Sequence, residues 1–179
     1  MNEFKLVFTG TMGAGKTTAI NAISEIETVK TDVKNTDQQS TKALTTVGLD
    51  YGLLTLENGD RVRLFGTPGQ SRFDFMWKII ARDAFGIIIL VDNSRPEPLA
   101  DLDQYLEGFA KELVELPCVI GVGRMEQHAA PNLDDYAAKL SERDLVLPVT
   151  AVDVRNRDEV IDLVDLLMVQ AEVFNLQNS

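Results

Sequence analysis

The sequence is short of residues that several protein classes require. It contains one cysteine, Cys118, so no disulfide can form within the chain, and a reducing compartment is the simplest interpretation. The one histidine, His128, excludes a histidine-based metal cluster. No apolar run approaches the roughly 20 residues that a membrane-spanning helix needs. These shortages disfavour a disulfide scaffold, a polyhistidine metal centre and a transmembrane protein.

Positive charge is also scarce. The chain has 17 Lys and Arg against 28 Asp and Glu, which gives a net charge of −11. Nucleic acids and anionic membranes both attract basic proteins, so we expect neither as a ligand. Asn2 and the tail 175–179 carry no lipidation signal, so we also expect no direct membrane anchor. The sequence therefore predicts a cytoplasmic protein whose acidity serves solubility.

Apolar strand-like runs alternate with helical patterns, which is typical of an α/β fold. The turn signal Asn58-Gly59 predicts a hairpin between the second and third strands. We expect one domain over residues 1–179, a three-layer sandwich with an about six-stranded, mostly parallel sheet, one antiparallel hairpin strand and helices on both faces. The predicted strands are 4–9, 47–56, 61–65, 86–92, 117–122 and 145–150, and the predicted helices are 16–26, 73–82, 99–114, 133–141 and 158–174.

A phosphate-binding motif lies between the first predicted strand and helix. Residues 10–17 match G-x-x-x-x-G-K-[ST] at every fixed position, so we expect a P-loop NTPase fold. The glycines let backbone N–H groups point inward, and the helix N-terminus adds partial positive charge. We expect Lys16 to reach the β- and γ-phosphates and the Thr17 hydroxyl to bind Mg²⁺. The predicted phosphate-site residues are Gly10, Thr11, Gly13, Ala14, Gly15, Lys16, Thr17 and Thr18.

Two further segments complete a family pattern. A long polar stretch, 27–46, has the length and position of a moving switch loop and ends in Thr45-Thr46-Val47-Gly48. The second segment is Phe65-Gly66-Thr67-Pro68-Gly69-Gln70, directly after the hairpin. Together with the P-loop, these segments resemble the Ras-like small GTPases, in particular the Arf branch and the bacterial gliding-motility GTPase MglA with its relatives.

The resemblance implies a molecular switch that binds GTP or GDP with Mg²⁺, hydrolyses GTP slowly and signals to partner proteins, as in the control of bacterial motility or polarity. It implies that Thr46 binds the metal and senses the γ-phosphate. Gly69 would give its N–H to that phosphate, and Gln70 would orient the attacking water. Lys16, Thr46 and Gln70 are the implied catalytic residues, and Thr17 and Thr46 the implied metal ligands.

Two segments depart from the family pattern. Gly66 stands where the family has an aspartate that holds a metal-bound water, which leaves the grip on Mg²⁺ unexplained. Asp92, which ends an apolar strand, is a candidate substitute. The base-reading segment, N-K-x-D in the family, reads Gly123-Arg124-Met125-Glu126. The implied base contacts are then Arg124, Glu126, Thr150 and Ala151, and the choice between GTP and ATP stays open.

The switch loop has no internal arginine finger, because no arginine occurs between Thr17 and Arg61. We therefore expect intrinsic hydrolysis at about 10⁻⁴ to 10⁻² s⁻¹ and an activating or effector partner, which for MglA-like proteins is a Roadblock-domain protein. Two alternatives remain open: a nucleotide-binding scaffold without turnover, and a small-molecule kinase that uses ATP. Trp77 is interpreted as core packing, with an exposed docking patch as the alternative.

Overall fold

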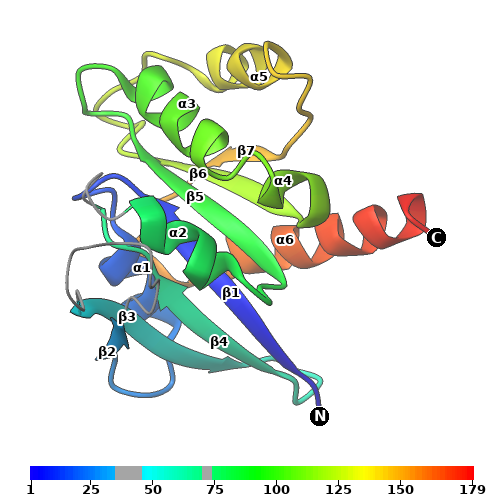
Figure 1. The fold of residues 1–179 in the computed structure, drawn as a ribbon. Coiled ribbons are helices and arrows are strands. Elements are labelled where there is room, and N and C mark those ends of the chain that lie inside the picture. The colour runs from blue at the N-terminus through cyan, green and yellow to red at the C-terminus, as the bar shows by residue number, and fades with distance from the viewer. Residues whose placement is uncertain (35–45, 70–73) are drawn as a thin grey trace, which may run out of the picture.

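The computed structural model describes residues 1–34, 46–69 and 74–179 (Figure 1). A seven-stranded sheet in the order β2-β3-β4-β1-β5-β6-β7 forms its centre. The strands are β1 (Glu3–Gly10), β2 (Val29–Lys34), β3 (Thr46–Thr55), β4 (Arg61–Gly66), β5 (Gly86–Asp92), β6 (Cys118–Gly123) and β7 (Val149–Ala151). The helices are α1 (Lys16–Ile23), α2 (Asp74–Ala81), α3 (Pro98–Gly108), α4 (Glu112–Glu115), α5 (Leu133–Ser141) and α6 (Arg157–Gln177).

The sheet is mostly parallel, as predicted. β1 pairs in parallel with β4 and β5, and β6 pairs in parallel with β5 and β7. β3 runs antiparallel to both of its neighbours, β2 and β4. This arrangement confirms the α/β fold class with one antiparallel hairpin strand.

Helices cover both faces of the sheet and bury alternate residues of its central strands. On β5, Ile88 and Leu90 pack with α1 and α6, whereas Ile87, Ile89 and Val91 pack with α2, α3, α4 and α5. All seven residues of β5 are buried, as expected for a central strand covered on both faces. The three-layer sandwich predicted from the alternating pattern is confirmed.

Trp77 belongs to the core on the second face. Its ring is 2% exposed and stacks on Tyr105 and Phe109, with ring centroids 4.5 and 5.4 Å away. A Cβ added at Gly108 would lie 2.8 Å from the Trp77 ring, so the end of α3 packs directly against the indole. The core interpretation of Trp77 is confirmed for this structure, and a docking role of the stretch around it stays a hypothesis.

Four expected elements differ from those observed. The helix expected over 16–26 ends at Ile23, because Ser24 has an extended backbone conformation. The polar segment expected to be loop includes the edge strand β2, whose six residues pair with β3 through the backbone and need no apolar side chains to do so. The helix expected over 99–114 divides into α3 and α4 beyond Gly108, a residue of low helix propensity. The last strand begins only after Pro148, which has no N–H for a sheet.

The hairpin between β3 and β4 closes through a three-residue loop, 57–59. Leu56 donates its N–H to the Asp60 carbonyl at 2.8 Å, and Gly59 donates to the Leu56 carbonyl at 2.9 Å. Gly59 has φ 86°, a left-handed conformation that favours glycine. This turn sets the register in which Asp50 lies opposite Gly66.

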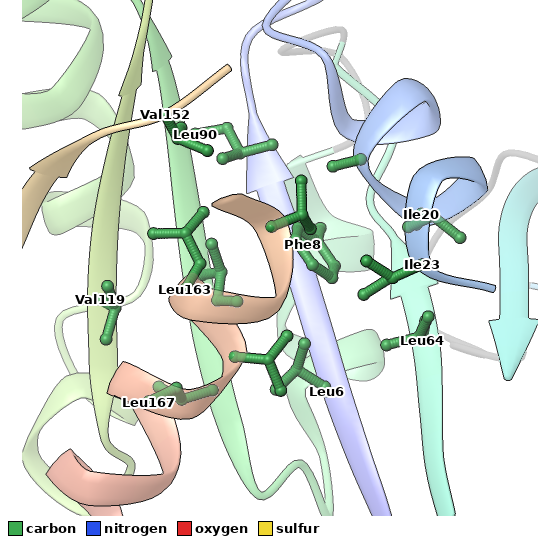
Figure 2. Packing of buried hydrophobic residues seen from close by; sticks show 14 of the residues in the cluster. Leu6, Phe8, Ile20, Ile23, Leu64, Leu90, Val119, Val152, Leu163 and Leu167 are labelled. Atoms are coloured by element: carbon green, nitrogen blue, oxygen red, sulfur yellow. The ribbon is translucent and has the colours of Figure 1, made fainter. Parts of the chain in front are cut away.

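The sheet and α6 are joined by interlocking aliphatic side chains. Leu163 and Leu167 of α6 project towards Leu6, Phe8 and Val119 of the sheet (Figure 2). A Cβ added at Gly86 would lie 2.8 Å from Leu167, so the helix approaches the start of β5 closely. Within the described ranges, no helix is long and apolar enough to cross a bilayer.

We predict that Leu167→Ala lowers the free energy of unfolding by about 2–5 kcal/mol, because it opens a cavity between α6 and the sheet. Val169→Ala on the same helix is the matched control: Val169 is 57% exposed, so the loss should stay within about 0.5 kcal/mol. Urea denaturation of both variants tests this, and similar losses for the two would contradict the packing described for α6.

Candidate functional site

The P-loop is a tight backbone turn between β1 and α1. A Cβ at Gly10 would lie 2.3 Å from the Leu90 carbonyl oxygen, and one at Gly15 would lie 2.6 Å from Val154. Both glycines also have positive φ, 148° and 99°. The turn therefore needs glycine at these positions, and it delivers the residues that follow to the N-terminus of α1, where free N–H groups favour anions.

A pocket of about 990 Å³ opens beside this turn. Its size lies at the upper end of the range typical of ligand sites. Its walls come from the P-loop, β2, β3, the end of β4, and the loops that follow β5, β6 and β7. The residues that line it include Met12, Lys16, Thr17, Gly48, Asp50, Gly66, Gly69, Gly123, Arg124, Glu126 and Ala151.

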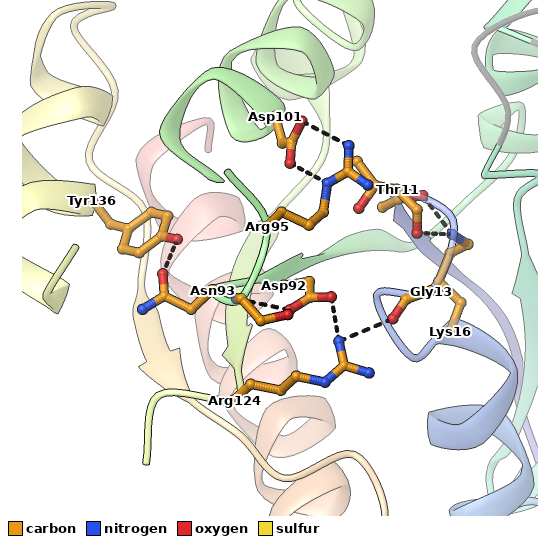
Figure 3. A network of polar contacts seen from close by, with 11 residues as sticks. Thr11, Gly13, Lys16, Asp92, Asn93, Arg95, Asp101, Arg124 and Tyr136 are labelled. Carbon is orange, nitrogen blue, oxygen red and sulfur yellow. Dashed lines mark hydrogen bonds and ion pairs between the residues drawn. The ribbon is translucent and has the colours of Figure 1, made fainter. Parts of the chain in front are cut away.

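Lys16 lies at the P-loop end of the pocket, and it is largely buried. Its ammonium donates to the carbonyls of Gly10 at 2.5 Å and Thr11 at 2.8 Å (Figure 3). Burial lowers the pKa of Lys16 to about 8, because it removes water from the ammonium, and the charge of Asp50 partly opposes that shift. The chain thus holds a desolvated cation where the motif predicts phosphate.

Asp50 is a site residue that the sequence analysis missed. It lies in β3, half-buried, and its carboxylate accepts a hydrogen bond from the Thr17 hydroxyl. Thr17 is the residue expected to bind Mg²⁺. A charged residue between the strand residues Leu49 and Tyr51 was the available signal, but its meaning depends on the register of the hairpin.

Gly69 lies against the P-loop. A Cβ added there would lie 2.5 Å from the Met12 nitrogen and 3.0 Å from the Lys16 ammonium nitrogen. This approach is too close for any side chain, which is the steric reason for a glycine at this position.

Arg124 connects the base-side loop to the P-loop. Its guanidinium donates to the Gly13 carbonyl at 3.2 Å and forms an ion pair with Asp92 (Figure 3). Burial alone would raise the pKa of Asp92, but hydrogen bonds from Ser94 and the pairing with Arg124 lower it below its ordinary value. In this structure the carboxylate considered as a metal substitute is therefore the partner of Arg124.

A buried side-chain bridge supports the same loop, and the sequence analysis missed it too. The Asn93 amide donates to the carbonyls of His128 at 2.6 Å and Pro131 at 3.0 Å, and the Tyr136 hydroxyl donates to the Asn93 carbonyl oxygen at 2.6 Å. Asn93 and Tyr136 are 3% and 0% exposed. An asparagine directly after a buried strand was the only signal in the sequence.

The remaining expected site residues fall into three groups. Gly13, Ala14, Gly15, Thr18, Glu126 and Ala151 line the pocket. Thr150, paired with Gly121 in the sheet, is not among the lining residues, and Gly10 and Thr11 face Lys16 through their carbonyls. Gln70 lies outside the described residues, and Thr46 is described only as the first residue of β3.

Comparison with known proteins gives a family match over two thirds of the chain. The family described as 50S ribosome-binding GTPase matches residues 5–124. An uncharacterized protein of Methanocaldococcus jannaschii is 34% identical over 95 residues, which cover 52% of this chain and 54% of that protein. Ras-related protein Rab-8A of Gallus gallus is 26% identical over 134 residues, which cover 73% of this chain and 52% of that protein.

The chain thus spans about half the length of these curated relatives. The family match begins in β1, includes the P-loop, the hairpin and β5, and ends at Arg124 in the base-side loop. On this match, and on the pocket that the same segments build, the chain belongs to the Ras-like superfamily of P-loop GTPases.

Proposed function

We propose that this chain is a molecular switch that binds GTP or GDP with Mg²⁺, hydrolyses GTP slowly and signals its nucleotide state to a partner protein. The observation that carries the proposal is one pocket in which Lys16, Gly69 and Glu126 all form part of the wall. These residues come from the three segments that in the family read the phosphates, the terminal phosphate and the base.

The phosphate end supports a triphosphate ligand. The Lys16 ammonium, held by two P-loop carbonyls, can exchange these acceptors for phosphate oxygens of greater negative charge. Mg²⁺, when bound, would neutralise phosphate charge, and the hydroxyls of Thr17 and Thr46 are the ligands we propose for it. We propose that Gln70 orients the attacking water and that the Thr46 backbone senses the γ-phosphate.

The position of Gly69 supports a switch. Because the Gly69 segment lies against Met12 and Lys16, a group inserted between this segment and the P-loop must displace it. GTP has such a group in its terminal phosphate, and GDP does not. We propose that this difference changes the conformation around Gly69 and is read by the partner.

The resemblance gives the remaining parts of the proposal. Since the switch loop has no arginine, we propose slow intrinsic turnover and a GTPase-activating or effector protein of the Roadblock type. An MglA-like role in bacterial motility or polarity and a cytoplasmic location belong to the same proposal, as does a single GTPase domain over residues 1–179.

A second candidate is a nucleotide-binding scaffold of relaxed base specificity without turnover. Gly123 offers no side chain to the base, and the Arg124 guanidinium is paired with Asp92. Guanine selectivity would then rest mainly on the exposed Glu126 carboxylate. A small-molecule kinase, by contrast, has no supporting feature in the pocket as described.

Nucleotide competition and single-turnover hydrolysis separate these functions. The switch predicts selective binding of GTP and GDP over ATP, and hydrolysis at about 10⁻⁴ to 10⁻² s⁻¹ without a partner. Equal binding of ATP and GTP with no turnover would favour the scaffold. A single-turnover rate above about 1 s⁻¹ for the isolated chain would contradict slow intrinsic turnover.

Glu126→Gln should weaken GDP binding about 10-fold or more relative to ADP binding. The carboxylate can accept from both the N1–H and the exocyclic amine of guanine, whereas the amide must present one donor to them. Calorimetry with both nucleotides measures the change. Gln127→Glu, one residue further along the pocket wall, is the control and should retain guanine preference. Unchanged selectivity in Glu126→Gln would remove Glu126 from base recognition.

Gly69→Ala should slow single-turnover GTP hydrolysis about 10-fold or more, because the added methyl group cannot fit against Met12 and moves the Gly69 N–H away from the phosphates. GDP affinity should stay within about threefold of the wild type, since GDP lacks the terminal phosphate. Val114→Ala is the control, because Val114 is 74% exposed in α4 and does not line the pocket. Wild-type hydrolysis by Gly69→Ala would argue against a role of this segment.

A further inference from the structure

The aspartate absent from position 66 has a counterpart on the neighbouring strand. Gly66 ends β4, and its partner across the antiparallel pair is Asp50 of β3. A Cβ added at Gly66 would lie 3.1 Å from the Ile20 Cδ1, which is its tightest contact, and in ordinary van der Waals contact with the Asp50 Cβ at 3.4 Å and an Asp50 carboxylate oxygen at 3.5 Å. A side chain at position 66 would therefore begin beside the Asp50 carboxylate, and both positions line the same pocket.

The Asp50 carboxylate has a defined hydrogen-bond role. It accepts a hydrogen bond from the Thr17 hydroxyl, and because Thr17 is the donor, the lone pairs of its oxygen stay free for another partner. Its negative charge also acts on the Lys16 ammonium, so it lies within the electrostatic reach of the phosphate end of the pocket. Asp50 is thus positioned to orient one candidate metal ligand and to add charge beside it.

The donor set fits Mg²⁺. Hydroxyl and carboxylate oxygens are the hard ligands that Mg²⁺ prefers, and Mg²⁺ is usually held by few protein oxygens together with substrate phosphates. Groups that hydrogen-bond a metal ligand fix its orientation and raise metal affinity. Gly66 alone cannot supply such a group, because it has no side chain.

We propose that Asp50 is the positioning residue for Mg²⁺, supplying from β3 the carboxylate that the family pattern expects at position 66. This inference rests on the proposed function, since it requires bound nucleotide and metal.

The first test compares the wild type, Asp50→Asn and Glu57→Gln as full-length chains. Dissociation of a fluorescent GDP analogue is measured over a series of free Mg²⁺ concentrations. Asp50→Asn should raise the Mg²⁺ concentration for half-maximal retention about 10- to 100-fold. Glu57→Gln removes one negative charge from the exposed loop of the same hairpin and should match the wild type. Thermal melting of each variant without nucleotide separates loss of metal support from loss of fold.

The second test moves the carboxylate. Asp50→Gly should show the same Mg²⁺ defect as Asp50→Asn, and Asp50→Gly combined with Gly66→Asp should recover most of the lost Mg²⁺ affinity. A carboxylate that only stabilised the fold would restore the melting temperature without restoring the Mg²⁺ response.

The outcomes separate a failure of the proposed function from a failure of the role proposed for Asp50. If the wild type retains no GDP analogue at any Mg²⁺ concentration, the proposed function and this inference fail together. If the wild type responds to Mg²⁺ and folded Asp50→Asn shifts that response less than about threefold, Asp50 has no role in metal binding, and the proposed function stands.

Discussion

The site depends on the close approach of the P-loop backbone to its neighbours. Gly10 lies against the Leu90 carbonyl and Gly15 against Val154, so the turn is held from β5 and from the loop after β7. The other parts of the pocket are then placed relative to this turn. Arg124 donates to Gly13, Gly69 approaches Met12, and Asp50 accepts from Thr17. Movement of the turn would therefore change the phosphate end and the base end together.

The sheet explains why segments far apart in sequence meet at this turn. The carboxyl ends of parallel strands open on one edge of the sheet, and the loops after β1, β4, β5, β6 and β7 gather there (Figure 1). β3 runs antiparallel to β4, so the residues that it contributes to this edge of the sheet, Gly48 and Asp50, lie in its first half. The carboxylate of Asp50 thus reaches the same edge from a strand that the rule for parallel sheets does not consider.

Sequence patterns predicted the features that depend on local chemistry. The P-loop motif, the apolar run of β5 and the periodicity of α6 each carry their own signal, and the fold class followed from their alternation. Features that depend on contacts between segments distant in the sequence were not predicted. β2 has no apolar pattern because an edge strand is held by backbone hydrogen bonds, and α3 ends where the Trp77 ring covers Gly108. The role of Asp50 can be recognised only from the register of the hairpin, and the role of Asn93 only from its hydrogen bond with Tyr136. The roles of Thr46 and Gln70 stay predictions.

The three-residue loop at 57–59 has a consequence for how this chain could diverge. It lies at the far end of the hairpin, yet it fixes which residue of β3 lies beside Gly66. Losing or gaining a single residue there would slide β3 by one position and turn Asp50 to the other face of the sheet. An exposed turn, normally the most permissive place for insertions, is therefore under selection for its length. Substitutions at Glu57 should accumulate freely, whereas Gly59 is held by its left-handed conformation and length changes should survive only in lineages where a carboxylate has moved back to β4.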